Sequence, residues 1–236
     1  MNIFTGSPRK MVDMETGEIS REIFVNEDIY QQERERVFGR AWLYIGHESQ
    51  VKTPGDFVLS RMGEESVIMT RDRAGKIHVM LNSCRHRGMR VCRYDEGHVN
   101  KFYCPYHGWA FNLDGALSHV TEFDSEYARQ NFNFDDWGLI KAPKVEILRG
   151  LVWASWDPDA DFDAYFGHTR RMLELGFCAW DGAGEVEVLG STQKWIIPSN
   201  WKIVAENFVG DMLHVVSHRS VDIVGIGPNA NDGRRD

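Results

Sequence analysis

Two short motifs that mix cysteine with histidine constrain this chain more than any other feature. The first is Cys-x-His at residues 84–86 and the second is Cys-x-x-His at residues 104–107, with residues 87–103 between them. Two thiolates on one iron and two imidazoles on the other suit a [2Fe–2S] cluster, and the neutral imidazoles raise its reduction potential. Gly88 and Gly108 give each loop the backbone freedom to turn around a metal. The pattern therefore predicts four cluster ligands: Cys84, His86, Cys104 and His107.

Two other sites would use some of the same residues. A structural zinc site takes cysteine and histidine, but its pairs usually read Cys-x-x-Cys and His-x(3–5)-His rather than mixed. A disulfide between Cys84 and Cys104 would leave both histidines unexplained. The remaining cysteines, Cys92 and Cys178, are expected to be reduced, buried thiols.

The segment NSCRHRGMRVC…CPYHGWAFNLDG resembles the Rieske [2Fe–2S] domain of the large (alpha) subunit of aromatic-ring-hydroxylating dioxygenases, such as biphenyl and naphthalene dioxygenases. Electron-transport Rieske proteins carry an extra cysteine beside each ligand pair, and Tyr106 stands in one of those places here. The resemblance implies an α+β fold. An antiparallel β Rieske domain would be followed by the beginning of an incomplete, helix-grip-like α+β catalytic domain.

Composition narrows the class of partner and the compartment. The chain has 236 residues and a formal net charge of −8, which makes nucleic acid an improbable partner. No apolar run approaches the length of a membrane span, and the opening residues lack a signal-peptide core. These features predict a cytoplasmic protein that binds no membrane.

Local patterns predict three domains: an arm and helix over 1–40, the Rieske domain over 41–160, and the start of a catalytic domain over 161–236. Asn26 is expected to cap a helix over 27–40. A second helix is predicted over 165–177 and a third over 201–218. Short β-branched and aromatic runs between glycine and proline turns predict strands, at 42–45, 57–61, 66–70, 77–81, 99–103, 109–112, 145–148 and 151–156. Residues 186–197 are expected to form a strand pair or one long strand.

The predicted helix over 201–218 carries a polar stripe. Taken at about 100° per residue, its members fall within an arc of roughly 60°; they are Asn207, Asp211, His214 and His218. An amphipathic helix with a solvated face would explain a polar stripe, but such faces are usually built from lysine, glutamate and arginine. Two histidines and a carboxylate are the usual ligands of non-haem Fe(II) oxygenases. The stripe therefore predicts a second metal site.

The resemblance extends to this stripe and assigns roles within it. It implies that His214 and His218 bind mononuclear Fe(II). Asp211 would bridge His214 to the Rieske histidine His107 across a subunit boundary, and Asn207 would lie near the iron. The family's third iron ligand is an aspartate far downstream, whereas the chain stops at Asp236. We therefore expect an amino-terminal portion of an alpha subunit.

The resemblance implies that the chain is the terminal oxygenase component of a multicomponent dioxygenase. A ferredoxin or ferredoxin reductase, supplied indirectly by NAD(P)H, would reduce the cluster. Fe(II) would then activate O2 to give an aromatic cis-dihydrodiol. The resemblance also implies an alpha-subunit trimer with a small beta subunit. A monooxygenase or demethylase of the same superfamily is one alternative. A non-catalytic Rieske electron carrier and a zinc-stabilised interaction domain are alternatives from other classes.

Overall fold

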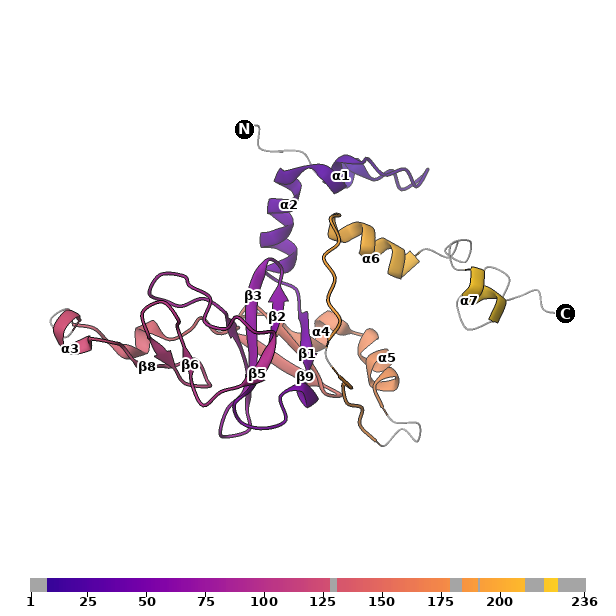
Figure 1. The fold of residues 1–236 in the computed structure, drawn as a ribbon. Coiled ribbons are helices and arrows are strands. Elements are labelled where there is room, and N and C mark those ends of the chain that lie inside the picture. The colour runs from indigo at the N-terminus through magenta and orange to yellow at the C-terminus, as the bar shows by residue number, and fades with distance from the viewer. Residues whose placement is uncertain (1–7, 128–130, 179–183, 191, 211–218, 225–236) are drawn as a thin grey trace. The chain divides into compact units, whose positions relative to one another are not determined.

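The computed structural model describes residues 8–127, 131–178, 184–190, 192–210 and 219–224 (Figure 1). The chain forms two compact units, one made of residues 32–191 and the other of residues 1–31 and 192–236. The predicted domain borders after residues 40 and 160 stay a prediction. Among the described residues, no helix is long and apolar enough to cross a bilayer.

The named elements described in the smaller unit are helices, and they are separated by irregular segments. Asn26 caps its second α-helix, because the side-chain oxygen accepts hydrogen bonds from the backbone N–H groups of Asp28 (3.0 Å) and Ile29 (3.4 Å). The predicted helix over 27–40 continues into the larger unit and changes there to a π-helical turn. The elements are η1 (Pro8–Met11), α1 (Glu22–Val25), α2 (Glu27–Glu33), the π-helical η2 (Arg34–Phe38), α6 (Trp201–Gly210) and α7 (Arg219–Val224).

The larger unit is built from antiparallel strands in three sheets. Their orders are β1-β10-β9, β4-β3-β2-β5 and β6-β7-β8. The strands are β1 (Leu43–His47), β2 (Asp56–Met62), β3 (Glu65–Arg71), β4 (Ile77–Leu81), β5 (Glu96–His98), β6 (Phe102–Tyr103), β7 (Ala110–Phe111), β8 (Leu117–His119), β9 (Lys144–Leu148) and β10 (Leu151–Ser155). The antiparallel fold agrees with the sequence expectation.

Turn chemistry explains why the predicted hairpins form. β9 and β10 pair from Leu148↔Leu151 outward, and the two residues between them are Arg149 (φ 51°) and Gly150 (φ 80°). Positive φ at both central residues is what a type I′ turn requires, and its twist matches that of the flanking strands. The sequence prediction of a hairpin joined at Arg149-Gly150 is confirmed.

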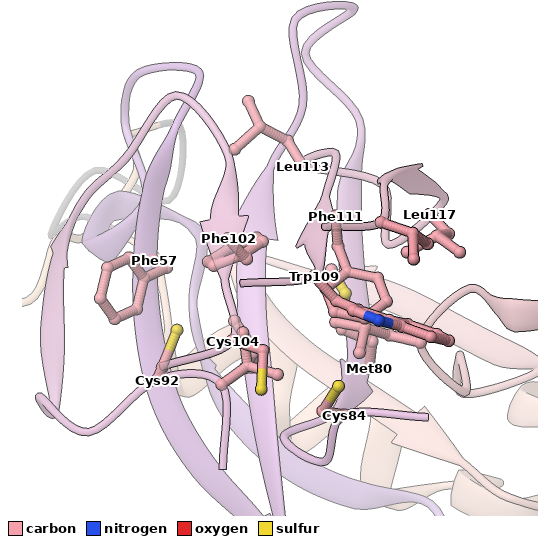
Figure 2. Close-up of a cluster of buried hydrophobic side chains, with 14 residues drawn as sticks. Phe57, Met80, Cys84, Cys92, Phe102, Cys104, Trp109, Phe111, Leu113 and Leu117 are labelled. Atoms are coloured by element: carbon pink, nitrogen blue, oxygen red, sulfur yellow. The ribbon is translucent and has the colours of Figure 1, made fainter. Parts of the chain in front are cut away.

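Two apolar cores hold these sheets. One includes Ile45, Val67 and Val152 and uses side chains from the β1 and β3 sheets. The other surrounds the ligand loops and contains Cys84, Cys104 and Trp109 (Figure 2). The second core lies between the β2–β4 strands and the short β6-β7-β8 sheet, since residues of both contribute to it: Phe57, Ile68, Met80, Phe102, Phe111 and Leu117. The ligand loops are therefore anchored by buried side chains.

Helical turns complete the larger unit, and one predicted helix is divided. They are η3 (Glu48–Gln50), α3 (Phe123–Glu126), η5 (Phe134–Trp137), α4 (Phe162–Phe166) and α5 (Thr169–Gly176). The predicted helix over 165–177 is two helices, because Gly167 adopts φ 47° and ends the first. The second helix ends at Gly176, one residue before the predicted end.

The prediction of a strand pair or one long strand over 186–197 is wrong. The described residues of this range adopt no regular secondary structure. A strand needs a neighbour to accept and donate its backbone hydrogen bonds, and no described strand pairs with this segment. Its apolar side chains are instead exposed, including Trp195 at 77% and Ile196 at 97%. Alternating hydrophobic residues alone were not sufficient to form a strand.

Candidate metal centre

The first ligand loop closes through its own backbone immediately after β4. The N–H of Cys84 donates to the carbonyl of Met89 (2.8 Å), and the N–H of Gly88 donates back to the carbonyl of Cys84 (2.8 Å). Gly88 has φ 70°, a left-handed conformation that glycine adopts without steric cost. This tight turn places His86 at its tip, between the cysteine and the glycine.

The second ligand loop repeats the same closure between β6 and β7. The N–H of Cys104 donates to the carbonyl of Trp109 (2.8 Å), and the N–H of Gly108 donates to the carbonyl of Cys104 (3.0 Å). Gly108 has φ 72°, close to the value in the first loop. Both loops therefore depend on a glycine four residues after the cysteine. The expected role of the two glycines is confirmed.

The two loops bring the predicted histidines together, with their rings edge-on at an interplanar angle of 66°. Nδ1 of His86 lies 3.1 Å from Nδ1 of His107, and the ring centroids are 4.6 Å apart. Two imidazole nitrogens bound to one metal at about 2.1 Å, with an angle of about 90–110° between them, would be roughly 3.0–3.4 Å apart. The spacing thus fits two nitrogens that share one iron.

The two cysteines of the loops are buried in the second core. Cys84 is 2% exposed and Cys104 is 3% exposed, and Figure 2 shows both within the cluster of apolar side chains. Burial, with the neighbouring Cys104 thiol as a smaller cause, raises the pKa of Cys84 to about 11. A bound metal would offset this cost, because it stabilises the thiolate directly. The donor set therefore fits a cationic metal group.

The arrangement of the two cysteine–histidine pairs argues against a disulfide and against a structural zinc site. All four cysteines are free thiols, so Cys84 and Cys104 form no disulfide. Within the described part of the chain, no three His, Cys, Asp or Glu side chains converge as they would around a single ion. A structural zinc takes four protein ligands at one point. Each iron of a [2Fe–2S] cluster needs only two, since inorganic sulfide supplies the others, so the residues fit the cluster better.

Aromatic rings fix the orientation of both histidines. Trp109, which is 2% exposed, stacks on His86 with a centroid distance of 4.9 Å and an interplanar angle of 7°. Tyr106 stacks on His107 at 3.8 Å and 28°. The pKa of His86 is lowered, first by burial and then by the neighbouring His107 and Arg87. A neutral imidazole is the form that binds a metal.

Sequence reasoning missed Asn82, which organises the first ligand loop. Its side chain is 2% exposed, and its Oδ1 accepts from the backbone N–H groups of Val91 (3.0 Å) and Cys92 (2.8 Å). Its Nδ2 donates to the carbonyl of Cys92 (2.9 Å). One amide thus ties the end of β4 to the far side of the loop. The sequence shows only an asparagine two residues before a ligand cysteine, and its burial becomes visible in the fold.

The second predicted constellation is only partly visible. The helix predicted from Trp201 begins there, with the side chain of Asn200 accepting from the N–H of Lys202 (3.0 Å). Asn207 lies on α6 and is exposed. Asp211, His214 and His218 lie outside the described residues, so their convergence on an iron stays a prediction.

Comparison with known proteins agrees with this centre. Residues 41–133 match the Rieske [2Fe–2S] domain family. The chain is 42% identical to the biphenyl 2,3-dioxygenase alpha subunit of Rhodococcus jostii, over 92% of this chain and 47% of that protein. It is 36% identical to the alpha subunit of a Sphingobium N,N-dimethyl phenylurea N-demethylase, over 89% and 45%.

A solved structure shares the fold. Naphthalene 1,2-dioxygenase from a Rhodococcus species superposes with a TM-score of 0.79 and 36% identity, over 89% of this chain and 48% of that one. The chain spans about half the length of the curated relatives it matches. It therefore contains a Rieske [2Fe–2S] domain and is, over nearly all of its length, a relative of the alpha subunits of aromatic-ring-hydroxylating dioxygenases.

Proposed function

We propose that this chain belongs to the oxygenase component of a multicomponent dioxygenase that cis-dihydroxylates an aromatic ring. The observation that carries the proposal is the close approach of the two histidine Nδ1 atoms, 3.1 Å apart, beside two buried cysteines. Cys84 and Cys104 would hold one iron, and His86 and His107 the other. The cluster supplies one-electron transfer when bound.

The chain's own residues prepare the centre for that task. The apolar shell around Cys84 and Cys104 excludes water, and the stacked rings hold both imidazoles in place. The two imidazoles would then need to move little when the cluster is reduced. His107 is partly exposed beside the exposed Tyr106. His86 is partly exposed as well, so an electron would be able to enter or leave through either imidazole.

The second half of the proposal concerns mononuclear iron and partners. His214 and His218 would bind Fe(II), which supplies the chemistry with O2. Asp211 would orient His214 and connect it to a Rieske histidine of a neighbouring subunit, and Asn207 would lie close by. The electron donor would be a ferredoxin or its reductase, charged by NAD(P)H. A small beta subunit is part of the proposed assembly, because the similar proteins are named as alpha subunits. The trimer of alpha subunits is what the family resemblance implies.

Loss of visible absorption tests the cluster. Cys104→Ala should remove it from the purified chain, because one iron would lose half of its protein ligands. Cys178→Ala is the matched control, since Cys178 is a half-exposed thiol outside both ligand loops. If Cys104→Ala kept the colour and the iron content of the parent chain, the ligand assignment would fail.

Product analysis tests the reaction. The complete assembly, supplied with ¹⁸O₂ and biphenyl, should yield a cis-dihydrodiol in which both oxygen atoms carry the label. A monooxygenase or demethylase is the second candidate, favoured by the similarity to the N-demethylase alpha subunit. It would instead incorporate one labelled atom, or release formaldehyde from an N-methyl substrate such as a dimethyl phenylurea.

A further inference from the structure

The outer nitrogen of His86 has a partner within the Rieske domain. The Tyr127 hydroxyl oxygen lies 3.4 Å from Nε2 of His86, at the long end of the hydrogen-bond range. Nδ1 of the same ring faces His107. If Nδ1 binds iron, Nε2 must carry the proton, so this N–H donates and the Tyr127 oxygen accepts.

Tyr127 is held firmly enough to act on His86. Tyr127 directly follows the last residue of α3, and its backbone N–H donates to the carbonyl of Phe123, the first residue of that helix (2.9 Å). Its ring packs edge-on against Trp109 (6.0 Å, 78°) and Phe132 (5.6 Å, 68°). Trp109 in turn stacks on His86. One face and one edge of the His86 ring are therefore fixed by two side chains that also contact each other.

The two histidines are surrounded differently. His86 stacks on a tryptophan that is 2% exposed, whereas the ring stacked on His107 belongs to Tyr106, which is 57% exposed. Both imidazoles are themselves partly exposed. The difference lies in the stacked ring, which is buried beside His86 and exposed beside His107.

We propose that Tyr127 is a positioning residue that tunes the reduction potential of the cluster through His86. The inference rests on the proposed ligand role of His86. Accepting the Nε2 proton fixes the tautomer and makes the imidazole a stronger electron donor to its iron. Stronger donation stabilises the oxidised iron, so the hydrogen bond lowers the potential. A phenol accepts more weakly than a carboxylate, so the effect is modest.

The test removes only the hydroxyl. Tyr127→Phe keeps the ring contacts with Trp109 and Phe132, and Tyr94→Phe makes the same change on a tyrosine that is 79% exposed. In Tyr127→Phe, the equilibrium constant for cluster reduction should rise about threefold, which corresponds to about 28 mV for one electron. Pulsed electron paramagnetic resonance should show an altered hyperfine coupling for one of the two histidine nitrogens. Tyr94→Phe should change neither quantity.

The iron and sulfide content of the parent chain tests the proposed ligand set separately from the role of Tyr127. A parent chain without a cluster would refute the proposed ligand set itself. A loaded Tyr127→Phe chain with an unchanged potential and unchanged nitrogen couplings would overturn only the role of Tyr127, as would a folded variant that assembles no cluster. If the phenylalanine variant folds poorly, difluorotyrosine at position 127 keeps the ring and hydroxyl, and at a pH low enough to keep its more acidic phenol protonated it weakens the oxygen as an acceptor. It must then raise the potential, and no rise would overturn the role.

Discussion

At the residue scale, the amide of Asn82 shows how one buried polar group can hold a ligand loop. It satisfies backbone groups of Val91 and Cys92 that no strand partner reaches. Because these groups lie in the interior, their hydrogen bonds cannot be replaced by water without rearranging the loop. The loop's geometry therefore depends on a side chain that binds no metal.

Asn82→Ala should lower the free energy of unfolding by about 3 kcal/mol, because each buried group left unpaired costs about 1–3 kcal/mol. Urea titration of the purified chain measures this loss. Asn100→Ala, at an exposed position, is the control and should change stability by less than about 0.5 kcal/mol. Equal stability of the two variants would show that Asn82 does not hold the loop.

The two cysteines outside the motifs should react very differently with iodoacetamide. Burial raises the pKa of Cys92 to about 12, and its side chain is 7% exposed. A raised pKa means that the reactive thiolate forms only as pH approaches that value, so at pH 8 Cys92 is a shielded neutral thiol. Mass spectrometry of the native chain at pH 8 should find Cys178 labelled and Cys92 unlabelled. Equal labelling would contradict the burial of Cys92.

Burial of a neutral thiol also gives stability a pH dependence. Since the pKa of Cys92 in the folded chain lies above the ordinary cysteine value of about 9, its contribution to stability is fully present below pH 9 and is lost as pH rises towards about 12. Cys92→Ala should therefore lose less stability than the parent chain between those pH values. Parallel urea titrations across that range would measure the difference, and identical slopes would contradict it.

At the element scale, the two ligand loops share one backbone design but differ in how much room their glycines have. A Cβ on Gly88 would meet nothing closer than the Ser83 hydroxyl at 3.8 Å. On Gly108 it would lie 2.5 Å from the Thr121 hydroxyl. Both positions require a positive φ, which costs an alanine about 1–2 kcal/mol.

Gly108→Ala should therefore destabilise the chain more than Gly88→Ala, which has only the backbone cost. Removing the obstructing side chain in a Gly108→Ala, Thr121→Ala double variant should recover the excess. Thermal unfolding of the three variants, with Thr121→Ala alone as reference, measures this coupling. A double variant no more stable than Gly108→Ala would show that the hydroxyl is not the obstacle.

Strands were predictable where local signals sufficed. The runs that became β2, β3 and β4 are rich in β-branched residues and lie between glycine turns, so their positions followed from sequence. β5 (Glu96–His98) and β8 (Leu117–His119) were missed, because three residues such as EGH or LSH carry no alternation. They exist only because a neighbouring strand accepts their hydrogen bonds.

The residues of the candidate site were likewise predictable only where the signal is local in the sequence. Cys84, His86, Cys104 and His107 could be predicted because each ligand pair lies within four consecutive residues. Tyr127 could not, since it lies 41 positions from His86 and meets it only through the fold. Asn82 could not be predicted either, because its partners ten residues away are backbone groups that no motif marks.

At the scale of the whole molecule, the described larger unit contains the proposed cluster site, whereas the proposed iron ligands belong to the other unit. In the complete protein, His214→Ala should lose mononuclear iron and turnover while the visible absorption of the cluster remains. Asn112→Ala, in the Rieske domain outside both ligand loops, should keep both. Iron analysis with activity assays checks this, and retained turnover in His214→Ala would remove His214 from the iron site.

The most direct test of the account is the composition and nitrogen coupling of the metal centre in the purified chain. The purified chain should contain about two irons and two sulfides. The electron paramagnetic resonance of its reduced state should show coupling to two histidine nitrogens, and both couplings should be lost in a His86→Ala, His107→Ala double variant. A colourless chain with one zinc, or a cluster without nitrogen coupling, would contradict the account.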